Sequence, residues 1–175
     1  VPQFTVLENV MVWMHHAIAA PLSGLVPVTL NHVALDVADR RRSIAFYRDL
    51  LGAGVVAEDV DHHITFLRLP GSGRYSDLAL HEHPDVAAAY PPDQIRMAHI
   101  GWEIDDPAHL VAAYDFFTAH TRVALAADFG VARSVMGFDP DGHVIEFELF
   151  TVGADGDPGF APLDVDALRV PAGVR

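Results

Sequence analysis

The sequence contains no cysteine. Disulfide bonds, thiolate catalysis and cysteine-ligated zinc sites are therefore excluded. The absence of thiols fits a reducing compartment, and we expect a cytoplasmic protein. Histidine is the side chain most often found on protein-bound metals, and the chain has 11 of them. The chain therefore has an ample supply of imidazole ligands for a metal site.

Positive charge is also scarce in this chain. Its 11 basic residues are outnumbered by 24 carboxylates, which gives a formal net charge of -13 at pH 7. A field of this sign repels nucleic acids and anionic membrane surfaces. We therefore expect neither of them as a partner.

Long apolar runs are missing as well. The longest apolar stretch near the N-terminus covers residues 10–20 and contains His15 and His16. It is too short to span a bilayer, and it lacks the basic leader of a signal peptide. We expect residues 1–28 to form an N-terminal arm that packs on the body or on a second subunit, and we expect a homodimer.

The remaining chain is long enough to bury a substantial core. With 175 residues and 51% apolar content, it fits one domain or two small modules. Turn and breaker residues divide it into a first module at 29–84, a linker at 85–96 and a second module at 97–150. The tail at 151–175 is rich in Gly, Pro and Asp, so we expect loop there.

The two modules repeat one order of elements. The patterns predict a helix at 39–51 in the first module and one at 106–120 in the second. Predicted strands cover residues 29–37, 54–60, 62–69, 76–81, 96–104, 123–126, 132–139 and 143–150. His32 and His99 are 67 residues apart, and so are the expected helix caps Asp39 and Asp106. These equal offsets indicate a duplication, and we predict an α+β fold in which two paired βαβββ modules form a curved mixed sheet cup. The two modules of one chain could build this cup, or modules from different chains could pair.

The duplicated strands carry side chains that bind metals. Because side chains alternate between the faces of a strand, His32 shares its face with Ala34 and Asp36. In the last strand, Glu146 lies inside an apolar run. Each residue alone has an ordinary interpretation as a core or surface side chain. Together, His32, His99 and Glu146 are expected to meet inside the cup as a metal site.

This ligand set leaves several coordination positions open. Two imidazoles and one carboxylate on one side of the ion are the arrangement expected for ferrous iron that binds substrate and dioxygen together. Manganese, cobalt, nickel or zinc could also occupy the site, since ligand type alone discriminates poorly between these metals.

Four segments carry a family resemblance. They are Asn31-His32-Val33-Ala34-Leu35, Ser43-Ile44-Ala45-Phe46-Tyr47 followed by Leu51-Gly52, His99-Ile100-Gly101-Trp102-Glu103, and Asp139-Pro140-Asp141-Gly142-His143-Val144-Ile145-Glu146. These segments resemble the signatures of the vicinal oxygen chelate superfamily, which includes glyoxalases, bleomycin resistance proteins and extradiol dioxygenases. The similarity covers about residues 29–150, and it implies βαβββ modules paired around a metal ion.

Three further segments narrow the resemblance. They are Asp61-His62-His63-Ile64, Leu78-Ala79-Leu80-His81-Glu82-His83-Pro84 and Arg133-Ser134-Val135. With them, the chain is most similar to the type I extradiol ring-cleaving dioxygenases. The resemblance implies iron(II) held by His32, His99 and Glu146, with manganese(II) or another divalent metal as the alternative. It also implies a catechol-like aromatic diol and dioxygen as substrates.

The duplication is asymmetric at the predicted metal site. Ala79 follows His32 by the same 47 residues that separate Glu146 from His99. Glyoxalase-type members of the superfamily have a fourth metal ligand at this place, and alanine cannot bind a metal. The sequence thus favours a three-ligand, open site, although His81 lies on the same face and is an alternative fourth ligand.

The chain also departs from the extradiol pattern. Ser76, Met136 and Phe129 stand where those enzymes usually have a histidine, a tyrosine and a second histidine. Together with Trp102, these three residues are candidates for lining a substrate pocket, and core packing explains their character equally well. Ring cleavage needs a proton acceptor. That role would pass to His81, His83 or His62, each of which could also be an ordinary surface residue, or to substrate and water.

Two other functions remain open on this scaffold. The same site could act as a Lewis acid on an enediolate, which gives an isomerase or lyase. A non-catalytic protein of the same fold that binds an aromatic ligand or an antibiotic is the other alternative. Fold alone does not choose among them, because one scaffold hosts many chemistries.

Overall fold

The computed structural model describes residues 29–85, 97–151 and 159–169. The chain divides into two compact units, 1–30 and 31–175, and the fold below is that of the second unit. The predicted N-terminal arm and most of the predicted linker lie outside the described residues. No helix in the described ranges is long and apolar enough to cross a membrane.

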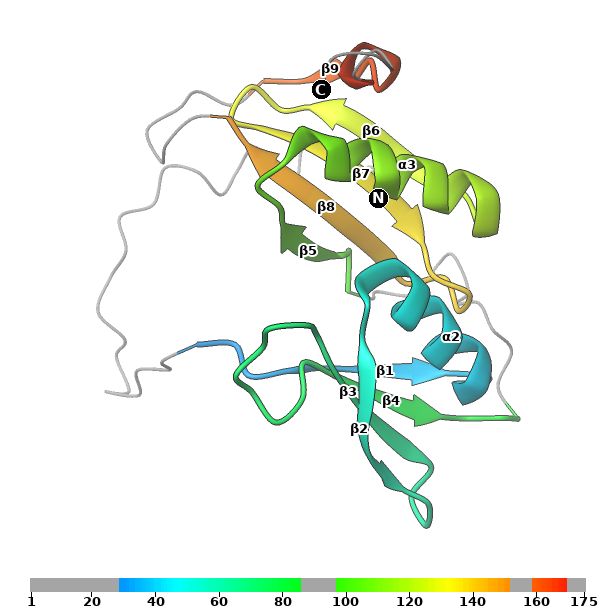
Figure 1. Cartoon of the computed structure of the whole chain (residues 1–175). Helices are drawn as coiled ribbons and strands as arrows, with labels where there is room; N and C mark the ends of the chain where they lie inside the picture. The colour runs from blue at the N-terminus through cyan, green and yellow to red at the C-terminus, as the bar shows by residue number, and fades with distance from the viewer. Residues whose placement is uncertain (1–28, 86–96, 152–158, 170–175) are drawn as a thin grey trace, which may run out of the picture. The chain divides into compact units, whose positions relative to one another are not determined.

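The first module is a four-stranded sheet with one helix (Figure 1). Its elements are β1 (Val33–Val37), α2 (Arg40–Leu51), β2 (Gly54–Asp59), β3 (Ile64–Arg68) and β4 (Leu78–Glu82). The strands lie in the order β1-β4-β3-β2. β1 and β4 are parallel, and the other neighbours are antiparallel.

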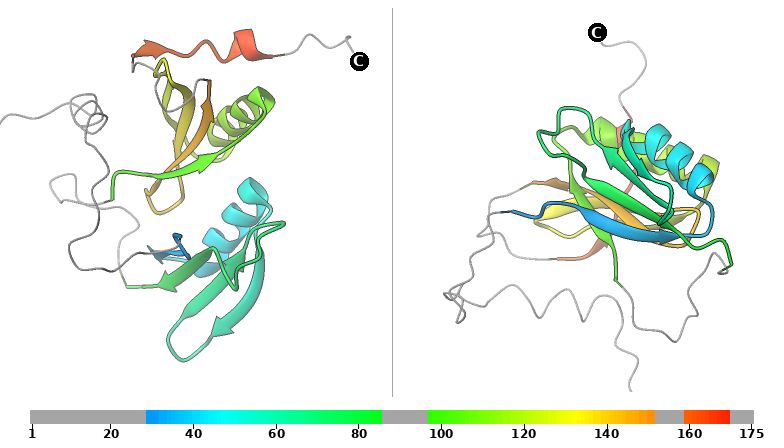
Figure 2. Two further views of the ribbon diagram at one scale, coloured as in Figure 1. Left: turned by 90° about the vertical axis from the view of Figure 1, so that its left-hand side faces the viewer. Right: turned by 90° about the horizontal axis from the view of Figure 1, so that it is seen from below.

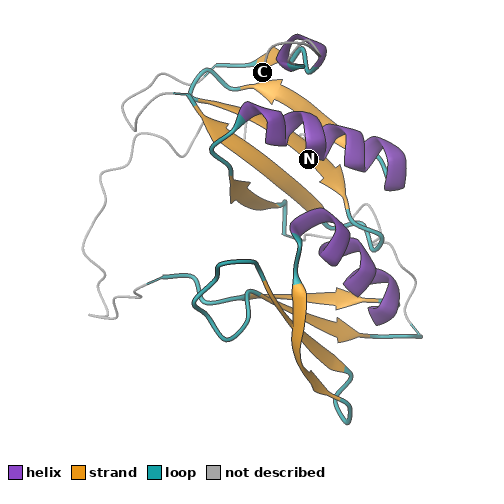
Figure 3. Ribbon diagram, in the orientation of Figure 1, coloured by secondary structure: helices purple, strands orange, loops and turns teal. Residues whose placement is uncertain are grey.

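The second module repeats this arrangement with one more strand (Figure 3). Its elements are β5 (Ile100–Glu103), α3 (Pro107–His120), β6 (Val123–Asp128), β7 (Ala132–Phe138), β8 (Val144–Phe150), β9 (Ala161–Pro162) and the 3-10 helix η1 (Asp166–Leu168). The strands lie in the order β5-β8-β7-β6-β9. The prediction of two βαβββ modules and an α+β fold is confirmed.

Both helices begin as local sequence chemistry predicts. The Asp39 carboxylate accepts a hydrogen bond from the backbone N–H of Arg42, and Asp106 accepts one from Ala108. Such side chains satisfy N–H groups that have no partner inside the helix. At the end of α2, Gly52 has a φ of 68°, a left-handed conformation that glycine adopts without steric cost.

Strand register confirms the duplication residue by residue. Ala34 of β1 pairs with Ala79 of β4, and Gly101 of β5 pairs with Glu146 of β8. Both members of the second pair lie 67 residues after their counterparts. Each module also has a register shift at an equivalent place, in the pairings of β2 with β3 and of β6 with β7. The modules are thus copies of one unit, and Ala79 occupies the place of Glu146.

One face of β1 is buried and the other is exposed. Leu35 and Val37 of β1 belong to the hydrophobic core, whereas Ala34 and Asp36 are exposed. The core continues into the second module, where α3 lies very close to its sheet. A Cβ atom added to Gly137 of β7 would lie 2.1 Å from a ring carbon of Phe117, so only glycine fits there.

The C-terminal tail contributes ordered structure, which its composition does not predict. β9 pairs with β6 through Ala161 and Pro162 (Figure 2). Val165 is buried in the core, and the Arg169 guanidinium binds both carboxylate oxygens of Asp115 on α3. A two-residue strand carries no alternating pattern of its own, because it forms on the backbone groups that β6 offers.

Candidate metal centre

A histidine and a buried glutamate meet on the second sheet. His99 directly precedes β5, and its Nε2 lies 3.0 Å from Oε2 of Glu146 on the neighbouring strand β8. Only 4% of Glu146 is exposed to solvent. A buried carboxylate is costly unless charge or hydrogen bonds compensate it. The His99 nitrogen and the Glu146 oxygen are thus close enough to bind one divalent cation together.

The other oxygen of Glu146 has a partner of its own. Ser134 of β7 is fully buried, and its hydroxyl donates a hydrogen bond to Oε1 of Glu146. Glu148 follows on the same face of β8 and pairs in register with Glu103 of β5. Burial, followed by the charges of Glu146 and Glu103, raises the pKa of the half-buried Glu148. This face of the second sheet therefore gathers acidic side chains around the His99–Glu146 pair.

His32 is not brought to this pair within the unit. Its side chain is exposed before β1, and its Nδ1 lies 2.8 Å from Oδ1 of Asn31. In the described ranges of the chain, no three His, Cys, Asp or Glu side chains gather as a group that could hold a metal ion. The unit thus supplies two of the three predicted ligands at one place, and the third elsewhere.

The contacts between the modules explain this separation. Phe46 of α2 and Phe116 of α3 pack edge to face, with ring centroids 5.5 Å apart. The modules therefore meet on the sides of the sheets that carry the helices. Ala34 and Asp36 are on the opposite, exposed face of β1, as Gly101 is on β5. His32, which the alternation of side chains places with Ala34, does not face Glu146 across this contact.

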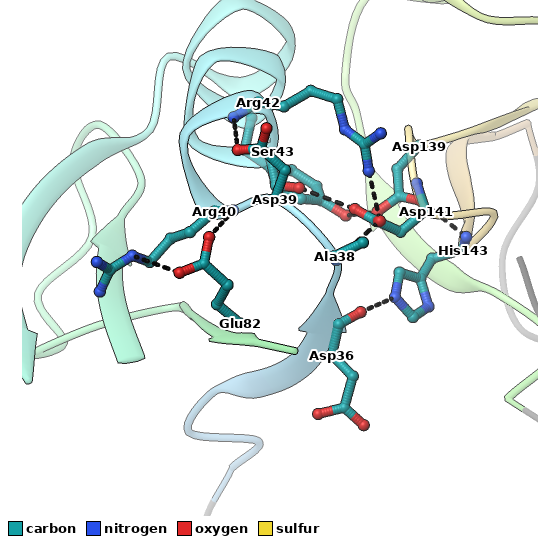
Figure 4. A network of polar contacts seen from close by, with 11 residues as sticks. Asp36, Ala38, Asp39, Arg40, Arg42, Ser43, Glu82, Asp139, Asp141 and His143 are labelled. Atoms are coloured by element: carbon teal, nitrogen blue, oxygen red, sulfur yellow. Dashed lines mark hydrogen bonds and ion pairs between the residues drawn. The ribbon is translucent and has the colours of Figure 1, made fainter. Parts of the chain in front are cut away.

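The buried carboxylate of Asp141 connects the two modules. The turn between β7 and β8 inserts Asp141, which is 4% exposed, at the start of α2 (Figure 4). Asp141 accepts hydrogen bonds from the Ala38 backbone N–H at 3.0 Å and from the Ser43 hydroxyl at 2.9 Å. The Arg42 guanidinium forms an ion pair with the same side chain. Asp141 therefore adds a second anionic cap to a helix of the other module.

Asp139 extends this contact along the helix. Its carboxylate accepts a hydrogen bond from the Tyr47 hydroxyl at 2.7 Å and from the backbone N–H groups of Asp141 and His143. Burial raises the pKa of Asp139, and burial and then the charge of Asp139 raise the pKa of Tyr47. His143 in turn has its Nε2 2.9 Å from the Asp36 carbonyl oxygen (Figure 4). Five polar contacts from the segment between β7 and β8 thus connect the two modules.

The histidines considered for proton transfer all lie in the first module. His83 Nε2 is 2.9 Å from Asp36, and His62 Nδ1 is 2.9 Å from Asp59 in the β2–β3 turn. His81 is half-buried on β4, next to Asp36 in register. His81 on β4 and His83 directly after it therefore both lie beside Asp36 of β1, whereas His62 lies in the turn between β2 and β3.

The four candidates for a substrate pocket are spread over the unit. Met136 is buried on β7 and pairs in register with Glu146, so it lies beside the metal-binding pair. Trp102 packs against the hydrophobic core, on the other face of β5 from Gly101. Phe129 packs on Phe160 in the tail, and Ser76 is buried before β4. Only Met136 is thus a neighbour of Glu146.

Two functional contacts were absent from the sequence interpretation. Ser134 and Asp141 belong to segments that carry the family resemblance, and the sequence predicts no role for either residue. The hairpin at Pro140-Asp141-Gly142 implies a register in which Met136 pairs with Glu146. Ser134 lies two residues before Met136, so its side chain is on the same face of the sheet and within reach of Glu146. That signal could have identified Ser134. No sequence signal places Asp141 on α2, because the contact depends on how the modules pack.

The sequence and the fold both have known relatives. A family model described as the Glyoxalase/Bleomycin resistance protein/Dioxygenase superfamily matches residues 29–147. None of the curated proteins matches the sequence.

Three solved structures illustrate the similarity of fold. A glyoxalase/dioxygenase from Nostoc punctiforme is 22% identical, with 78% of this chain and 99% of that chain covered and a TM-score of 0.57. A lactoylglutathione lyase from Agrobacterium tumefaciens is 24% identical over 70% and 94% of the two chains, with a TM-score of 0.52. A variant of the fosfomycin resistance protein FosX from Listeria monocytogenes, complexed with Mn(II) and a dihydroxypropylphosphonic acid, is 17% identical over 74% and 95%, with a TM-score of 0.58.

Proposed function

Because the chain belongs to the Glyoxalase/Bleomycin resistance protein/Dioxygenase superfamily, we propose that it is a divalent-metal enzyme of the vicinal oxygen chelate type. The proposed activity is iron(II)-dependent extradiol cleavage of a catechol-like aromatic diol by dioxygen. The proposed metal ligands are His99, Glu146 and His32.

The observation that carries the proposal is the pair formed by His99 and Glu146. A buried carboxylate 3.0 Å from an imidazole nitrogen, on adjacent strands, is a pair of donors that can bind one cation together. Ala79 at the equivalent place in the first module supplies no fourth ligand. The set therefore keeps positions free for two adjacent oxygens of a substrate, which favours a chelating diol.

We further propose that the third ligand comes from a second copy of the chain. His32 and Glu146 lie on sheet faces that do not meet within the unit, because the modules contact each other through α2 and α3. Pairing the face of one copy's first module that carries Ala34 with the face of the other copy's second module that carries Glu146 would bring His32 to His99 and Glu146. A homodimer of this kind has two equivalent sites.

The ligands suit iron(II), and manganese(II) is the alternative. Neutral imidazole and carboxylate bind both ions, and ligand type alone discriminates poorly between them. Ferrous iron, when bound, would supply the redox chemistry and the positive charge that activate a diol toward dioxygen. The chain's own contribution is to hold the ligands in place. Met136 beside Glu146 adds an apolar surface that suits an aromatic ring.

Oxygen uptake tests the proposed reaction directly. The protein is purified and loaded with ferrous iron under anaerobic conditions, and it is then mixed with a panel of catechols in air-saturated buffer. We expect stoichiometric consumption of dioxygen and diol with at least one compound, and a coloured ring-opened product. Metal-loaded protein that consumes no dioxygen with any catechol would exclude the dioxygenase.

A lyase or isomerase acting on an enediolate is the second candidate. Met136 favours it, because an apolar side chain stands beside Glu146 at the place where extradiol enzymes usually have a hydrogen-bonding tyrosine. Such an enzyme would use the metal only as a Lewis acid. It would turn over without dioxygen and with redox-inert divalent ions. Protein that binds an aromatic ligand but no metal would instead favour a non-catalytic binding protein.

The shared site predicts complementation between two inactive variants. His32→Ala and Glu146→Ala should each abolish activity as pure proteins. Mixed after mild unfolding and refolding, they should form heterodimers in which one of the two sites regains all three ligands. With random pairing we expect about a quarter of the wild-type number of sites. Metal stoichiometry and turnover of the mixture measure this recovery.

The control mixes two variants that remove ligands from the same module. His99→Ala with Glu146→Ala should restore nothing, because no pairing then gives an intact second module. If this mixture recovers as much activity as the first, or if neither recovers, the ligands are not shared in the proposed way.

A further inference from the structure

We propose that Ser134 is a positioning residue that holds Glu146 as a metal ligand through one oxygen only. Ser134 engages Oε1, and Oε2 is thereby presented beside His99. This inference rests on the proposed function, since it assigns a role to a residue that supports the proposed metal site.

The position of Ser134 follows from the strand register. β7 and β8 are antiparallel, and Met136 is the residue directly opposite Glu146. Ser134 lies two residues further along β7 on the same face, where diagonal neighbours are within reach of a long side chain. The glutamate leans across this diagonal, and its Oε1 accepts the hydrogen bond of the buried Ser134 hydroxyl.

The two oxygens of Glu146 therefore have different surroundings. Oε1 faces β7 and is occupied by the Ser134 donor, whereas Oε2 faces β5 and lies 3.0 Å from His99 Nε2. The residue of β5 in register with Glu146 is Gly101, and a Cβ atom there would be in ordinary contact with Oε2, at 3.5 Å. A serine on one neighbouring strand and a glycine on the other thus leave Oε2 as the oxygen that can reach a cation.

Fixing the carboxylate in this way has two physical effects. A glutamate side chain held in one rotamer loses less conformational entropy when it binds a metal. With Oε1 engaged, the carboxylate also binds through one oxygen instead of two, which leaves one more coordination position for substrate. Both effects favour a bidentate substrate at the open site.

A purely structural role for Ser134 predicts different behaviour. In that case the hydroxyl would only satisfy a buried carboxylate, and its removal would lower stability without a specific effect on the metal. Ser43 provides a matched comparison, because it is also fully buried and also donates to a buried carboxylate, that of Asp141. Ser43 lies on α2, away from His99 and Glu146.

The test measures metal affinity and stability separately. Wild type, Ser134→Ala, Ser134→Thr and Ser43→Ala are prepared as full-length apoproteins. Each is titrated with Mn(II) by electron paramagnetic resonance and with Co(II) in competition with a chromophoric chelator, and the Tm of each apoprotein is recorded. We expect Ser134→Ala to weaken metal binding by about 10- to 100-fold. Ser43→Ala should lower the Tm and leave metal affinity near the wild-type value, and Ser134→Thr, which keeps the hydroxyl, should recover most of the affinity.

The possible failures are distinguishable. If the wild type binds the metals and Ser134→Ala binds them as tightly, the positioning role is wrong and the proposed metal enzyme stands. If Ser43→Ala weakens binding as much as Ser134→Ala, the effect is one of stability and the positioning role is again wrong. If the wild type binds neither metal, the proposed function fails, and the role of Ser134 fails with it.

Discussion

Glu146→Gln is expected to lose metal binding almost completely. The substitution keeps the size of the side chain and removes its charge. The amide can still form hydrogen bonds with Ser134 and His99, but its neutral oxygen binds a divalent cation much more weakly than a carboxylate does. Loss of a carboxylate ligand should weaken metal affinity by more than about 100-fold, beyond the effect typical of residues that merely support a ligand. Isothermal titration of the apoprotein with Mn(II) measures this change.

Glu148→Gln serves as the control for Glu146→Gln. Glu148 lies two residues further on the same face of β8 and contributes the same formal charge. If the long-range field of the acidic face bound the cation, both substitutions would weaken binding alike. We expect Glu148→Gln to bind the metal nearly as tightly as the wild type. Equal losses in the two variants would contradict a specific ligand at Glu146.

Asp141→Ala is expected to destabilise the protein strongly. The substitution removes the acceptor of the Ala38 N–H and the Ser43 hydroxyl, and it leaves Arg42 without its ion pair at the start of α2. The Arg42 guanidinium is 41% exposed and can be solvated, whereas the Ser43 hydroxyl is fully buried, and a buried donor left without its acceptor costs about 1–3 kcal/mol. Urea unfolding followed by circular dichroism, with the free energy extrapolated to water, measures the loss.

An exposed ion pair gives the matched comparison for Asp141. Asp49 binds Arg48 at 2.8 Å, and about half of each side chain is exposed to solvent. Pairs of this kind contribute about 0–1 kcal/mol, so Asp49→Ala should change the free energy of unfolding very little. A small effect of Asp141→Ala, similar to that of Asp49→Ala, would show that the contact between modules does not depend on this carboxylate.

The sequence predicted those parts of the fold that depend on local chemistry. Asp39 and Asp106 cap their helices because a short acceptor side chain acts on the N–H groups two or three residues away. The equal offset of 67 residues located equivalent strands without any knowledge of their packing. The alternation of polar and apolar residues also identified the face of β8 on which Glu146 lies. In each case the determining interaction lies within a few residues, or within one repeated unit.

The sequence did not predict the contacts that depend on packing between distant segments. The sequence predicted that His32, His99 and Glu146 form one site, and it left open whether the modules that carry them pair within one chain or between two chains. Which faces meet depends on the Phe46–Phe116 contact and on Asp141, and both arise between segments about 70 to 100 residues apart. Trp102 has the character of a pocket residue, and its packing against the core follows from its face on β5. Hydrophobicity alone does not distinguish a pocket wall from a core.

The register shift in β2 disfavours edge-to-edge pairing of the first sheet with the sheet of another molecule. In the described part of the chain β2 is the last strand of the first sheet, and it exposes Val55 and Val56 to solvent. A flat outer strand with exposed valines can recruit the same strand of another molecule and start aggregation. The irregularity between Val55 and Ala57 bends and twists this strand, which disfavours such pairing. In the second module the equivalent strand β6 has a register shift too, and β9 additionally pairs with its end at Ala127 and Asp128, so less of that outer strand is free to pair with another molecule.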